Sequence, residues 1–547
     1  DTANYAITYV NAITGSTTLS VDSDSVVNVE KLVFSDATVA IVGRGGSEYL
    51  TLNATNLVVS STTKFWGNLA INSSTFTDAL ELDALTARFV AGSTVTVDTI
   101  GMNSVQLAAV AANPTTSGVV IYPPVQVVSG STITGYFTTI QAGINFATAG
   151  DTVNVAAGTY DVSTVLTFNK ALTLRGASTG SAGTEAARAS ETILVDARSA
   201  DPLNFGFGAA FVVSTPNAVV IDGVTFQGSK ILFNGDSGPS VSGPLNLTIS
   251  NSRLILAAIP ASGNWNLYLQ GNCALTLTNN FFQTTGFNVD NASMLFWEGT
   301  YAGTGSSNIA SITGNTFKGI SDTSSYNNGN GQSLHHLNLG GVQGTVSNNI
   351  FNGSDIGVTL ANACGNLTVS SNTFTNMHRA AQDLLNGDYA AGILLFSPQF
   401  NGPISITGNT FTSNDSGIRS SSYPGGTWTG SGMTISGNTF SGNLYDIVSK
   451  YPLSELVLSG SNVLNGKTLS TQTTNELIAT GDKIADKVDV GTWGLVRTKA
   501  ANVYMSTNSY VVAGGTSAAS VARALAAASA NDTLNIGTGA YTDGAVT

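Results

Sequence analysis

A six-residue phrase recurs along the middle of the chain and constrains the fold more than any other feature. It joins an aliphatic residue to an apolar residue, usually Phe, five places later, with Thr, Ser, Gly and Asn between them. Successive copies end 23 to 37 residues apart. A unit this short cannot enclose a hydrophobic core alone, so the copies must stack on one another. The clearest copies span 312–317, 346–351, 369–374, 406–411 and 435–440, and weaker copies extend the series from 221 to 463.

An asparagine occupies the same place in six copies, two residues before the final apolar residue. The apolar residues suit two short strands, and the polar residues between them suit a tight bend. Asn tolerates the left-handed backbone of a sharp bend, and its amide can donate to one neighbouring copy while accepting from the other. We therefore predict a ladder of side-chain hydrogen bonds rather than a row of unrelated surface turns. Its members are Asn280, Asn315, Asn349, Asn372, Asn409 and Asn438.

This pattern resembles the corner of the right-handed parallel β-helix in the pectin-lyase-like superfamily, and the resemblance covers roughly residues 137–470. It implies an all-β solenoid fold. It does not select one activity, because this superfold carries lyases, hydrolases, epimerases, phage spikes and surface adhesins.

Composition limits the partners and ligands expected for such a solenoid. Only 10% of the residues are charged, and 20 Lys and Arg against 33 Asp and Glu give a net charge of −13. This balance argues against a nucleic-acid partner or an anionic membrane surface, and favours Ca²⁺ or neutral glycans as ligands. No apolar run reaches the length of a membrane-spanning helix, so we expect no membrane insertion. Asp1 is expected to be a processed or trimmed end.

The two cysteines lie at nearly the same place on their coils, because Cys273 precedes Asn280 by seven residues and Cys364 precedes Asn372 by eight. Three coils would separate them, or about 14 Å at the spacing of paired strands, which is beyond the reach of a disulfide. We expect two buried free thiols, with a catalytic thiol as the alternative.

Residues 1–125 are predicted to form a β-rich N-terminal domain that lacks the Asn corner. The stretch 21–41 resembles the segment that follows the calcium repeats of secreted RTX proteins, although the nonapeptide repeats themselves are absent. Asp22, Asp24 and Asp36 supply oxygen atoms that could bind Ca²⁺. The alternative is that these carboxylates are solvated turn residues.

A second, longer repeat relates the start of the solenoid to the end of the chain. Residues 138–149 have a Thr cap, apolar spacing and a terminal Gly, which predict a short amphipathic helix that covers the end of a β-helix spanning 126–470. Residues 140–160 align without a gap with 521–541, at an offset of 381. We therefore predict a connector over 471–517 and a second helix-capped unit from 518 to 547. Tandem solenoids of this kind resemble large bacterial cell-surface and biofilm proteins.

A candidate acid/base site follows from counting four residues past each corner Phe. This count places Asp355, His378 and Asp415 on consecutive coils, with Arg379 adjacent. An imidazole between two carboxylates can transfer protons, and both neighbours would raise its pKa. The alternative is that both Asp residues serve their own turns.

The motifs of known enzymes on this fold are absent: there is no Asp-Asp pair, no Gly-His-Gly, and no Tyr-Gly-x-Asp-Pro-His. The longest coils carry aromatic residues that could stack on sugar rings if they are exposed, or cover the flank of the solenoid if they are not. These glycan-binding candidates are Trp297, Tyr301, Tyr326 and Trp428.

The main prediction is a secreted structural or adhesive unit of a bacterial cell surface, such as a surface layer, filament or adhesin, that self-associates through its solenoid. One alternative is a polysaccharide lyase or epimerase centred on His378. Another is a calcium-dependent adhesion module formed by the N-terminal residues.

Overall fold

A computed structural model of the chain describes most of residues 124–541, together with residue 543. For the first 123 residues it describes only the backbone of ten short strands. The gaps after residue 124 are 138, 163–164, 196–210, 214, 229–230, 234–244, 257–264, 271–272, 285–291, 299–307, 321–333, 362–363, 379–389, 397–399, 401, 421–431, 451–454, 510–518, 542 and 544–547.

The chain divides into two compact units, of which the first comprises Asp1–Ala157 and Lys170–Ala177. Its N-terminal strands pair in parallel in three small sheets, ordered β1-β4-β7-β9-β10, β2-β5-β8 and β3-β6. Parallel pairing of short successive strands is the pattern of a solenoid. The strands are β1 Thr17–Leu19, β2 Val26–Val29, β3 Leu32–Val33, β4 Val39–Val42, β5 Leu50–Ala54, β6 Leu57–Val58, β7 Lys64–Trp66, β8 Leu69–Ser73, β9 Ser93–Val97 and β10 Gly118–Ile121.

The same unit contains the predicted capping helix, α2 (Ile140–Phe146). A hairpin of β11 (Val125–Ser129) and β12 (Thr132–Phe137) precedes it. After the helix, β13 (Thr152–Val155) pairs antiparallel with β11 on one edge and parallel with β16 (Leu172–Arg175) on the other. Parallel pairing after the hairpin therefore begins with the strand that follows the helix.

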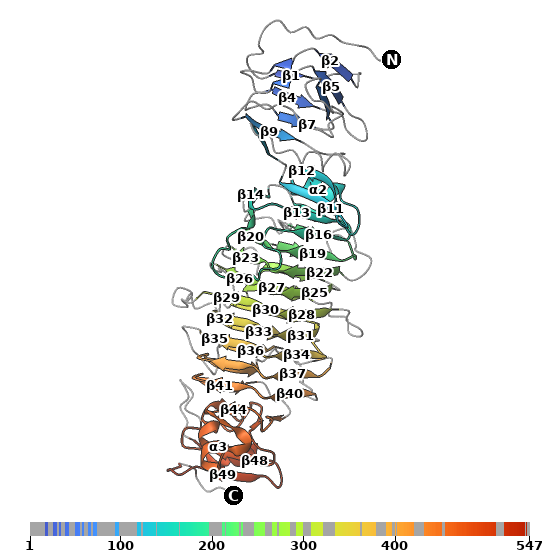
Figure 1. Cartoon of the computed structure of the whole chain (residues 1–547). Coiled ribbons are helices and arrows are strands. Elements are labelled where there is room, and N and C mark those ends of the chain that lie inside the picture. The colour runs from blue at the N-terminus through green and yellow to red at the C-terminus, as the bar shows by residue number, and fades with distance from the viewer. Residues whose placement is uncertain are drawn as a thin grey trace, which may run out of the picture. The chain divides into compact units, whose positions relative to one another are not determined.

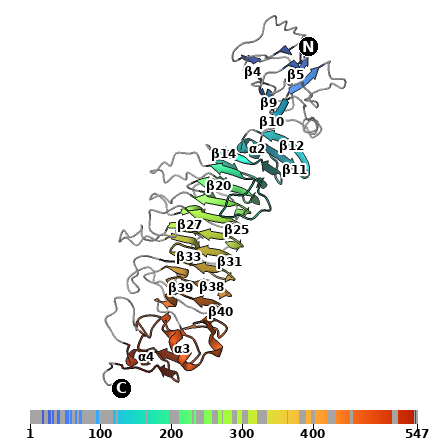
Figure 2. The ribbon, with the colours of Figure 1, turned by 60° about the vertical axis from the view of Figure 1, so that its left-hand side comes forward.

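The second unit, Gly158–Asn169 and Ser178–Thr547, contains three columns of stacked strands (Figures 1 and 2). Successive coils add strands to these columns, and neighbouring strands are parallel except for β44 and β45. The predicted parallel β-helix is confirmed.

The first column is β19 Val219–Asp222, β22 Leu245–Ser250, β25 Cys273–Thr278, β28 Ile309–Thr313, β31 Gln343–Ser347, β34 Leu367–Ser370, β37 Ile404–Thr407 and β40 Met433–Ser436. The second is β14 Gly158–Asp161, β17 Thr192–Val195, β20 Val224–Gly228, β23 Arg253–Leu256, β26 Phe281–Thr284, β29 Thr316–Lys318, β32 Ile350–Asn352, β35 Thr373–Thr375, β38 Thr410–Thr412, β41 Thr439–Ser441, β44 Val463–Leu464 and β45 Lys467–Thr468. The third is β21 Ile231–Phe233, β24 Trp265–Gln270, β27 Ala292–Glu298, β30 Leu334–Gly340, β33 Ile356–Leu360, β36 Ala391–Leu395, β39 Ser416–Ser420, β42 Tyr445–Ser449 and β46 Ile484–Ala485. A separate parallel pair joins β15 (Leu166–Phe168) to β18 (Phe211–Val213).

The recurring Phe residues form a continuous stack within the core of this unit, beside buried Leu, Ile and Val side chains. Their rings are stacked, with centroids 4.6 to 5.0 Å apart from one coil to the next. Each buried aromatic ring contributes about 1.5–3 kcal/mol from burial. The stack consists of Phe282, Phe317, Phe351, Phe374, Phe411 and Phe440.

Glycines of the third column make room for these rings. A Cβ atom added to Gly392 would lie 2.6 Å from Cδ1 of Phe411 and 2.8 Å from the carbonyl oxygen of Gly417. Gly357 and Gly417 have the same close contacts with Phe374 and Phe440. A side chain at any of these positions would push a ring out of the stack.

The bend between the first and second columns has one left-handed residue, but this residue is not the ladder Asn. The left-handed residue directly precedes the ladder position in each of these coils, so our prediction that the ladder Asn bends the chain is wrong. The preceding residue makes the bend, and the Asn that follows can turn its amide into the stack. The left-handed residues are Gly223, Asn251, Asn279, Gly314, Asn348, Ser371, Gly408 and Gly437.

The last described part of the second unit contains short helices and strands. α3 (Thr474–Gly481) follows the 3-10 helix Leu469–Thr471 and begins with a capping box between Thr473 and Glu476. The remaining elements are β43 Leu456–Val457, β47 Val496–Arg497, β48 Asn502–Met505, α4 Val521–Ala527 and β49 Thr533–Ile536. Among them, β43 pairs with β47 and β48 pairs with β49, both in parallel.

Candidate functional site

The asparagine amides lie in a single hydrogen-bonded row inside the second unit. The side-chain nitrogen of Asn372 donates to the side-chain oxygen of Asn409 at 3.0 Å and to the carbonyl oxygen of Val346 at 2.9 Å. The same Asn409 oxygen accepts from the backbone N–H of Asn372. The pattern repeats from Asn280 to Asn438 and ends on Asn462, which was not among the residues predicted from the sequence.

A second, shorter ladder lies at the next bend. The side-chain oxygen of Asn414 accepts from the N–H of Met377, and its amide donates to Asn443, which in turn donates to Asp446. This ladder was not predicted from the sequence. Counting three residues past the corner Phe residues, instead of four, would have found it, because Met377, Asn414 and Asn443 share that place.

The predicted acid/base residues lie immediately beyond this second bend. The N–H of His378 donates to the carbonyl of Ser354, and the N–H of Asp415 donates to the carbonyl of Met377. These bonds place Asp355, His378 and Asp415 at equivalent positions of successive coils. The structure therefore brings these three candidates together, whereas Arg379 lies outside the described residues.

Nδ1 of His378 lies 2.9 Å from Oδ1 of Asp415, a hydrogen bond that becomes an ion pair when the imidazole is protonated. The Asp415 side chain is 2% exposed, whereas that of His378 is 47% exposed. The hydrogen bond to Asp415 raises the pKa of His378, against the smaller effect of burial. An exposed imidazole oriented by a buried carboxylate can accept and release a proton at a surface.

Asp355 lies in a different environment from Asp415. Its Oδ2 accepts a hydrogen bond from the backbone N–H of Leu334 at 2.9 Å, and the residue is buried. This bond holds the start of strand β30. This contact joins two coils and is not a bond within the turn of Asp355 itself, and Asp415 is the carboxylate that raises the pKa of His378.

The other two histidines are buried in the solenoid. The ring of His336 lies beside the stacked rings of Phe317 and Phe351, with its centroid 6.3 and 5.9 Å from theirs, and burial lowers its pKa to about 3. Nδ1 of His335 lies 2.5 Å from the hydroxyl oxygen of Thr359. Neither ring is exposed to a substrate.

The predicted glycan-binding role of Trp297 is wrong, because its side chain is 0% exposed. It lies within β27 between the paired residues Leu269 and Leu339, at a position that faces other apolar side chains. The other candidates, Tyr301, Tyr326 and Trp428, lie outside the described residues.

Cys273 and Cys364 are buried free thiols. Burial raises the pKa of Cys273 to about 12 and that of Cys364 to about 11, so both are protonated at neutral pH. The calcium candidates Asp22, Asp24 and Asp36 lie outside the described residues. Within the part of the chain that the structure describes, no three His, Cys, Asp or Glu side chains form a group that could hold a metal.

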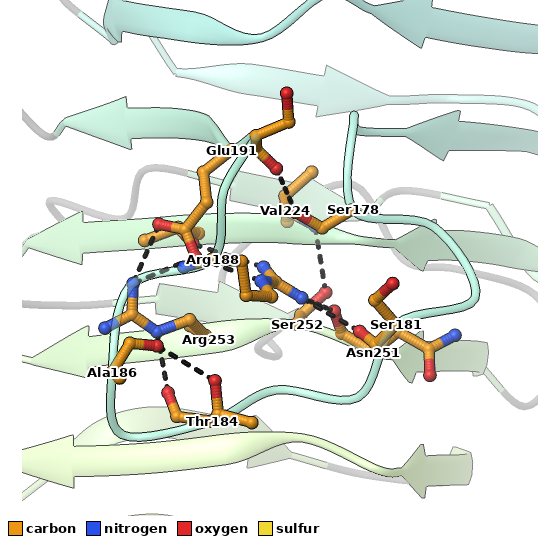
Figure 3. Close-up of polar contacts among 12 residues, drawn as sticks. Ser178, Ser181, Thr184, Ala186, Arg188, Glu191, Val224, Asn251, Ser252 and Arg253 are labelled. Atoms are coloured by element: carbon orange, nitrogen blue, oxygen red, sulfur yellow. Dashed lines mark hydrogen bonds and ion pairs between the residues drawn. The ribbon is translucent and has the colours of Figure 1, made fainter.

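A charged strap, residues 178–191, lies across the earlier coils of the second unit (Figure 3). Glu191 is its anchor: its carboxylate lies 2.7 Å from Nη1 of Arg253 and 2.9 Å from Nε of Arg188. Arg253 also donates to the carbonyls of Thr184 and Glu185. All three charged side chains are at least 90% buried. This cluster was not predicted from the sequence, because its members are far apart and have no periodic signal.

The strap contacts the bends themselves. Its donors reach the carbonyl oxygens of three left-handed residues on successive coils. These bonds are Ser178 N–H to Gly223, Arg188 Nη1 to Asn251 and Gly183 N–H to Asn279. A Cβ at Gly183 would lie 2.2 Å from the carbonyl oxygen of Ser252, so only glycine fits there.

The helix α2 and the strand β13 that follows it recur as α4 and β49, at the offset of 381 residues seen in the sequence. Both the helices and the strands that follow have equivalent bounds. The side chain of Thr139 caps α2 and that of Ser520 caps α4. Following the helices, Asp151 accepts from the N–H of Thr148 and Asp532 from the N–H of Ser529, both at 2.7 Å.

The two copies differ in what lies beside the strand. β13 has a neighbour on each edge, β11 and β16, whereas among the described residues β49 pairs with β48 alone. The exposed fractions of the apolar side chains differ between the two copies in the same way. Ile144 and Val155 are 0% and 3% exposed, whereas the equivalent Leu525 and Ile536 are 47% and 44% exposed.

Together these features define the class of the protein: a parallel β-helix whose amide and aromatic ladders run through successive coils. No protein-family model, curated protein or solved structure matches the chain. Among the described residues, none of the helices has the length and apolarity that crossing a membrane requires.

Proposed function

We propose that this chain is a structural unit of an extracellular assembly, a surface layer, filament or adhesin, in which β-solenoids join end to end. The observation that carries this proposal is the return of the helix-capped unit at α4, with the same caps and strand bounds as at α2. A recurring unit that can start parallel coils is the basis of a tandem array. The resemblance to the pectin-lyase-like superfamily and to large bacterial surface proteins supports the same role.

The contacts inside the second unit suit a load-bearing scaffold. Its register is fixed by buried amide ladders and by a continuous stack of rings, both of which depend on every coil being in place. Such a scaffold resists bending and slipping because adjacent coils cannot move without breaking several buried contacts at once.

Electron microscopy and sedimentation velocity of the purified chain test the structural role. We expect linear assemblies whose length grows with protein concentration. Dispersed single particles at every concentration, with and without Ca²⁺, would contradict it. Dissociation of the assemblies by EDTA would identify a calcium-dependent joint.

The His378–Asp415 pair favours a second candidate function, a glycan-active enzyme such as a polysaccharide lyase or epimerase. Its support is an exposed imidazole whose pKa is raised by a buried carboxylate. A panel of uronic-acid polymers tests this function by the ultraviolet absorbance of unsaturated products or by epimer analysis. Activity that His378→Ala abolishes, and that a control at the exposed β22 position, Asn246→Ala, retains, would establish the enzyme.

A further inference from the structure

A single arginine connects the last coils of the solenoid to the residues around α4, which we call the α4 repeat (519–541). Arg497 lies at the end of β47, and its side chain is 3% exposed. β47 pairs in parallel with β43, so Arg497 lies beside Val457. A guanidinium carries five N–H donors in a fixed plane, and burying them is costly unless acceptors are close. The acceptors of Arg497 come from both sides of the connector.

Glu455, the residue before β43, binds the guanidinium from the side of the solenoid. Nε of Arg497 donates to Oε2 of Glu455 at 2.8 Å, and Nη2 donates to Oε1 at 2.5 Å. This two-point contact fixes the direction of the carboxylate in a way that a lysine could not. The hydrogen bonds from Arg497 lower the pKa of Glu455, so this carboxylate is charged at neutral pH.

Asp532, the residue before β49, binds the same guanidinium from the side of the α4 repeat. Nη2 of Arg497 donates to Oδ2 of Asp532 at 2.6 Å, and the Asp532 side chain is 5% exposed. Hydrogen bonds from the N–H of Ser529 and from Arg497 lower the pKa of Asp532, so it is also charged at neutral pH. One buried cation therefore holds two carboxylates that are far apart in the sequence.

The turn after α4 differs from the equivalent turn after α2 in a way that serves this contact. Asp151 accepts from both the N–H and the hydroxyl of Thr148, at 2.7 and 2.8 Å. Asp532 accepts the N–H of Ser529 in the same way, but the hydroxyl of Ser529 donates to Glu455 at 3.2 Å. The turn after α4 thus keeps its own hydrogen bond and adds contacts to the preceding solenoid.

Apolar contacts hold the connector on both sides of Arg497. Trp493 packs in a cluster with Val448 of β42, and Leu495 and Val503 pack in another cluster with Ala524 of α4. Apolar contacts are not directional, so they bring the two sides together without fixing their relative rotation. The planar guanidinium supplies the directional contact.

We propose that Glu455, Arg497 and Asp532 form a clamp that fixes the orientation of the α4 repeat relative to the solenoid coils before it. Across this clamp the chain behaves as one stiff body, not as two bodies on a flexible linker. Without Arg497, two carboxylates that share the same Nη2 atom would face each other with no cation between them, and their repulsion would open the joint. The inference rests on the proposed structural role and names the contact that keeps its repeats aligned.

The test uses the full chain with a nitroxide spin label on each side of the clamp, at Thr434→Cys in β40 and Ala526→Cys in α4, both exposed positions. The native thiols Cys273 and Cys364 are buried, so the label is expected to attach to the introduced cysteines. Double electron-electron resonance is expected to give one narrow distance between the labels. In Arg497→Met this narrow distance is expected to be lost to a broad distribution.

Two further variants make the test specific. Lys499→Met removes the same charge from an exposed position two residues away, and is expected to leave the distance narrow. Glu455→Gln keeps the bond between Arg497 and Asp532 but loses the charge on the solenoid side, and is expected to broaden the distribution. Equal broadening by Lys499→Met, or a narrow distance in Glu455→Gln, would refute the clamp.

Hydrogen exchange over α4 distinguishes an opened joint from an unfolded repeat. Broadened distances with the protection of α4 retained support the clamp. If Arg497→Met loses that protection, the distance in Glu455→Gln decides, because Glu455 is 42% exposed and its replacement leaves the buried pair in place.

The outcomes also separate the clamp from the general role. Linear assemblies in the microscope, together with a narrow distance in Glu455→Gln, would keep the structural role and reject the clamp. A broadened distance in the clamp variants, without linear assemblies of the parent chain, would keep the clamp and reject the structural role.

Discussion

The coils from 273 to 441 and the coils from 219 to 256 make the same bend but stabilise it differently. In the later coils an uncharged amide ladder lies inside the bend. In the earlier coils Val224 and Ser252 occupy the ladder positions, and the charged strap 178–191 holds the bends at Gly223 and Asn251 from outside. The strap and the ladder meet at the next coil, where Gly183 bonds Asn279 and the side chain of Asn280 accepts from the N–H of Ser252. One backbone shape can therefore be fixed either by identical neutral contacts or by a single dedicated segment.

The largest expected loss of stability comes from removing two members of the amide ladder. Asn372→Ala together with Asn409→Ala removes acceptors for buried N–H groups and donors for buried carbonyls. Each buried group left unpaired costs about 1–3 kcal/mol, so the double variant is expected to lower the free energy of unfolding by several kcal/mol. Thermal and urea unfolding followed by circular dichroism measure this, with Asn246→Ala, at an exposed position of β22, as the control. An unchanged melting temperature would contradict a stabilising ladder.

Removing the carboxylate that anchors the strap is expected to lower the free energy of unfolding by a smaller amount. Glu191→Gln leaves Arg253 and Arg188 buried without their carboxylate, at about 3 kcal/mol. Limited proteolysis is expected to cut the variant within 178–191 faster than the parent protein, while the amides of β35 and β38 keep their protection against hydrogen exchange. Equal proteolysis rates would show that Glu191 does not anchor the strap.

The amide ladder and the strap are expected to respond differently to acid, because of these two features only the strap contains a titrating group. Burial by itself raises the pKa of Glu191, but hydrogen bonds from Arg188 and the charge of Arg253 outweigh it and leave the pKa lowered from 4.5. This stabilisation is therefore complete above pH 4.5 and is lost as pH falls through the lowered value. Urea unfolding of the parent and of Glu191→Gln is expected to converge at low pH. A constant difference across the range would exclude this linkage.

The smallest expected effect belongs to the exposed ion pair. The pKa of His378 is raised from 6.5, so its stabilisation is complete below pH 6.5 and is lost as pH rises through the raised value. Solvent limits it to less than about 1 kcal/mol. NMR titration is expected to show the pKa of His378 falling toward 6.5 in Asp415→Asn. No change in that variant would show that Asp415 does not control the imidazole.

Periodic features of the fold could be predicted from the sequence, and features that occur once could not. The repeated Asn and Phe predict stacked coils because each stacking contact joins identical residues at a fixed place. The burial of Trp297 was not predictable, because the spacing of the repeats does not show which side of an insertion faces the core. The left-handed residue was misplaced by one position, since Asn can occupy both the left-handed position and the ladder position after it, as Asn279 and Asn280 do. The strap occurs once and is not part of the repeat, so no pattern in the sequence predicts the contact between Glu191 and Arg253.

The stacked rings also bear on how a chain of this kind changes in length. Because Phe351 and Phe374 present equivalent surfaces to their neighbours, an in-frame deletion of residues 352–374 would join Phe351 to Thr375 and bring the flanking rungs into direct contact. Duplication of the same segment would insert one more coil. A gene encoding such a rod can therefore lengthen or shorten its product in whole rungs, without a new core having to evolve.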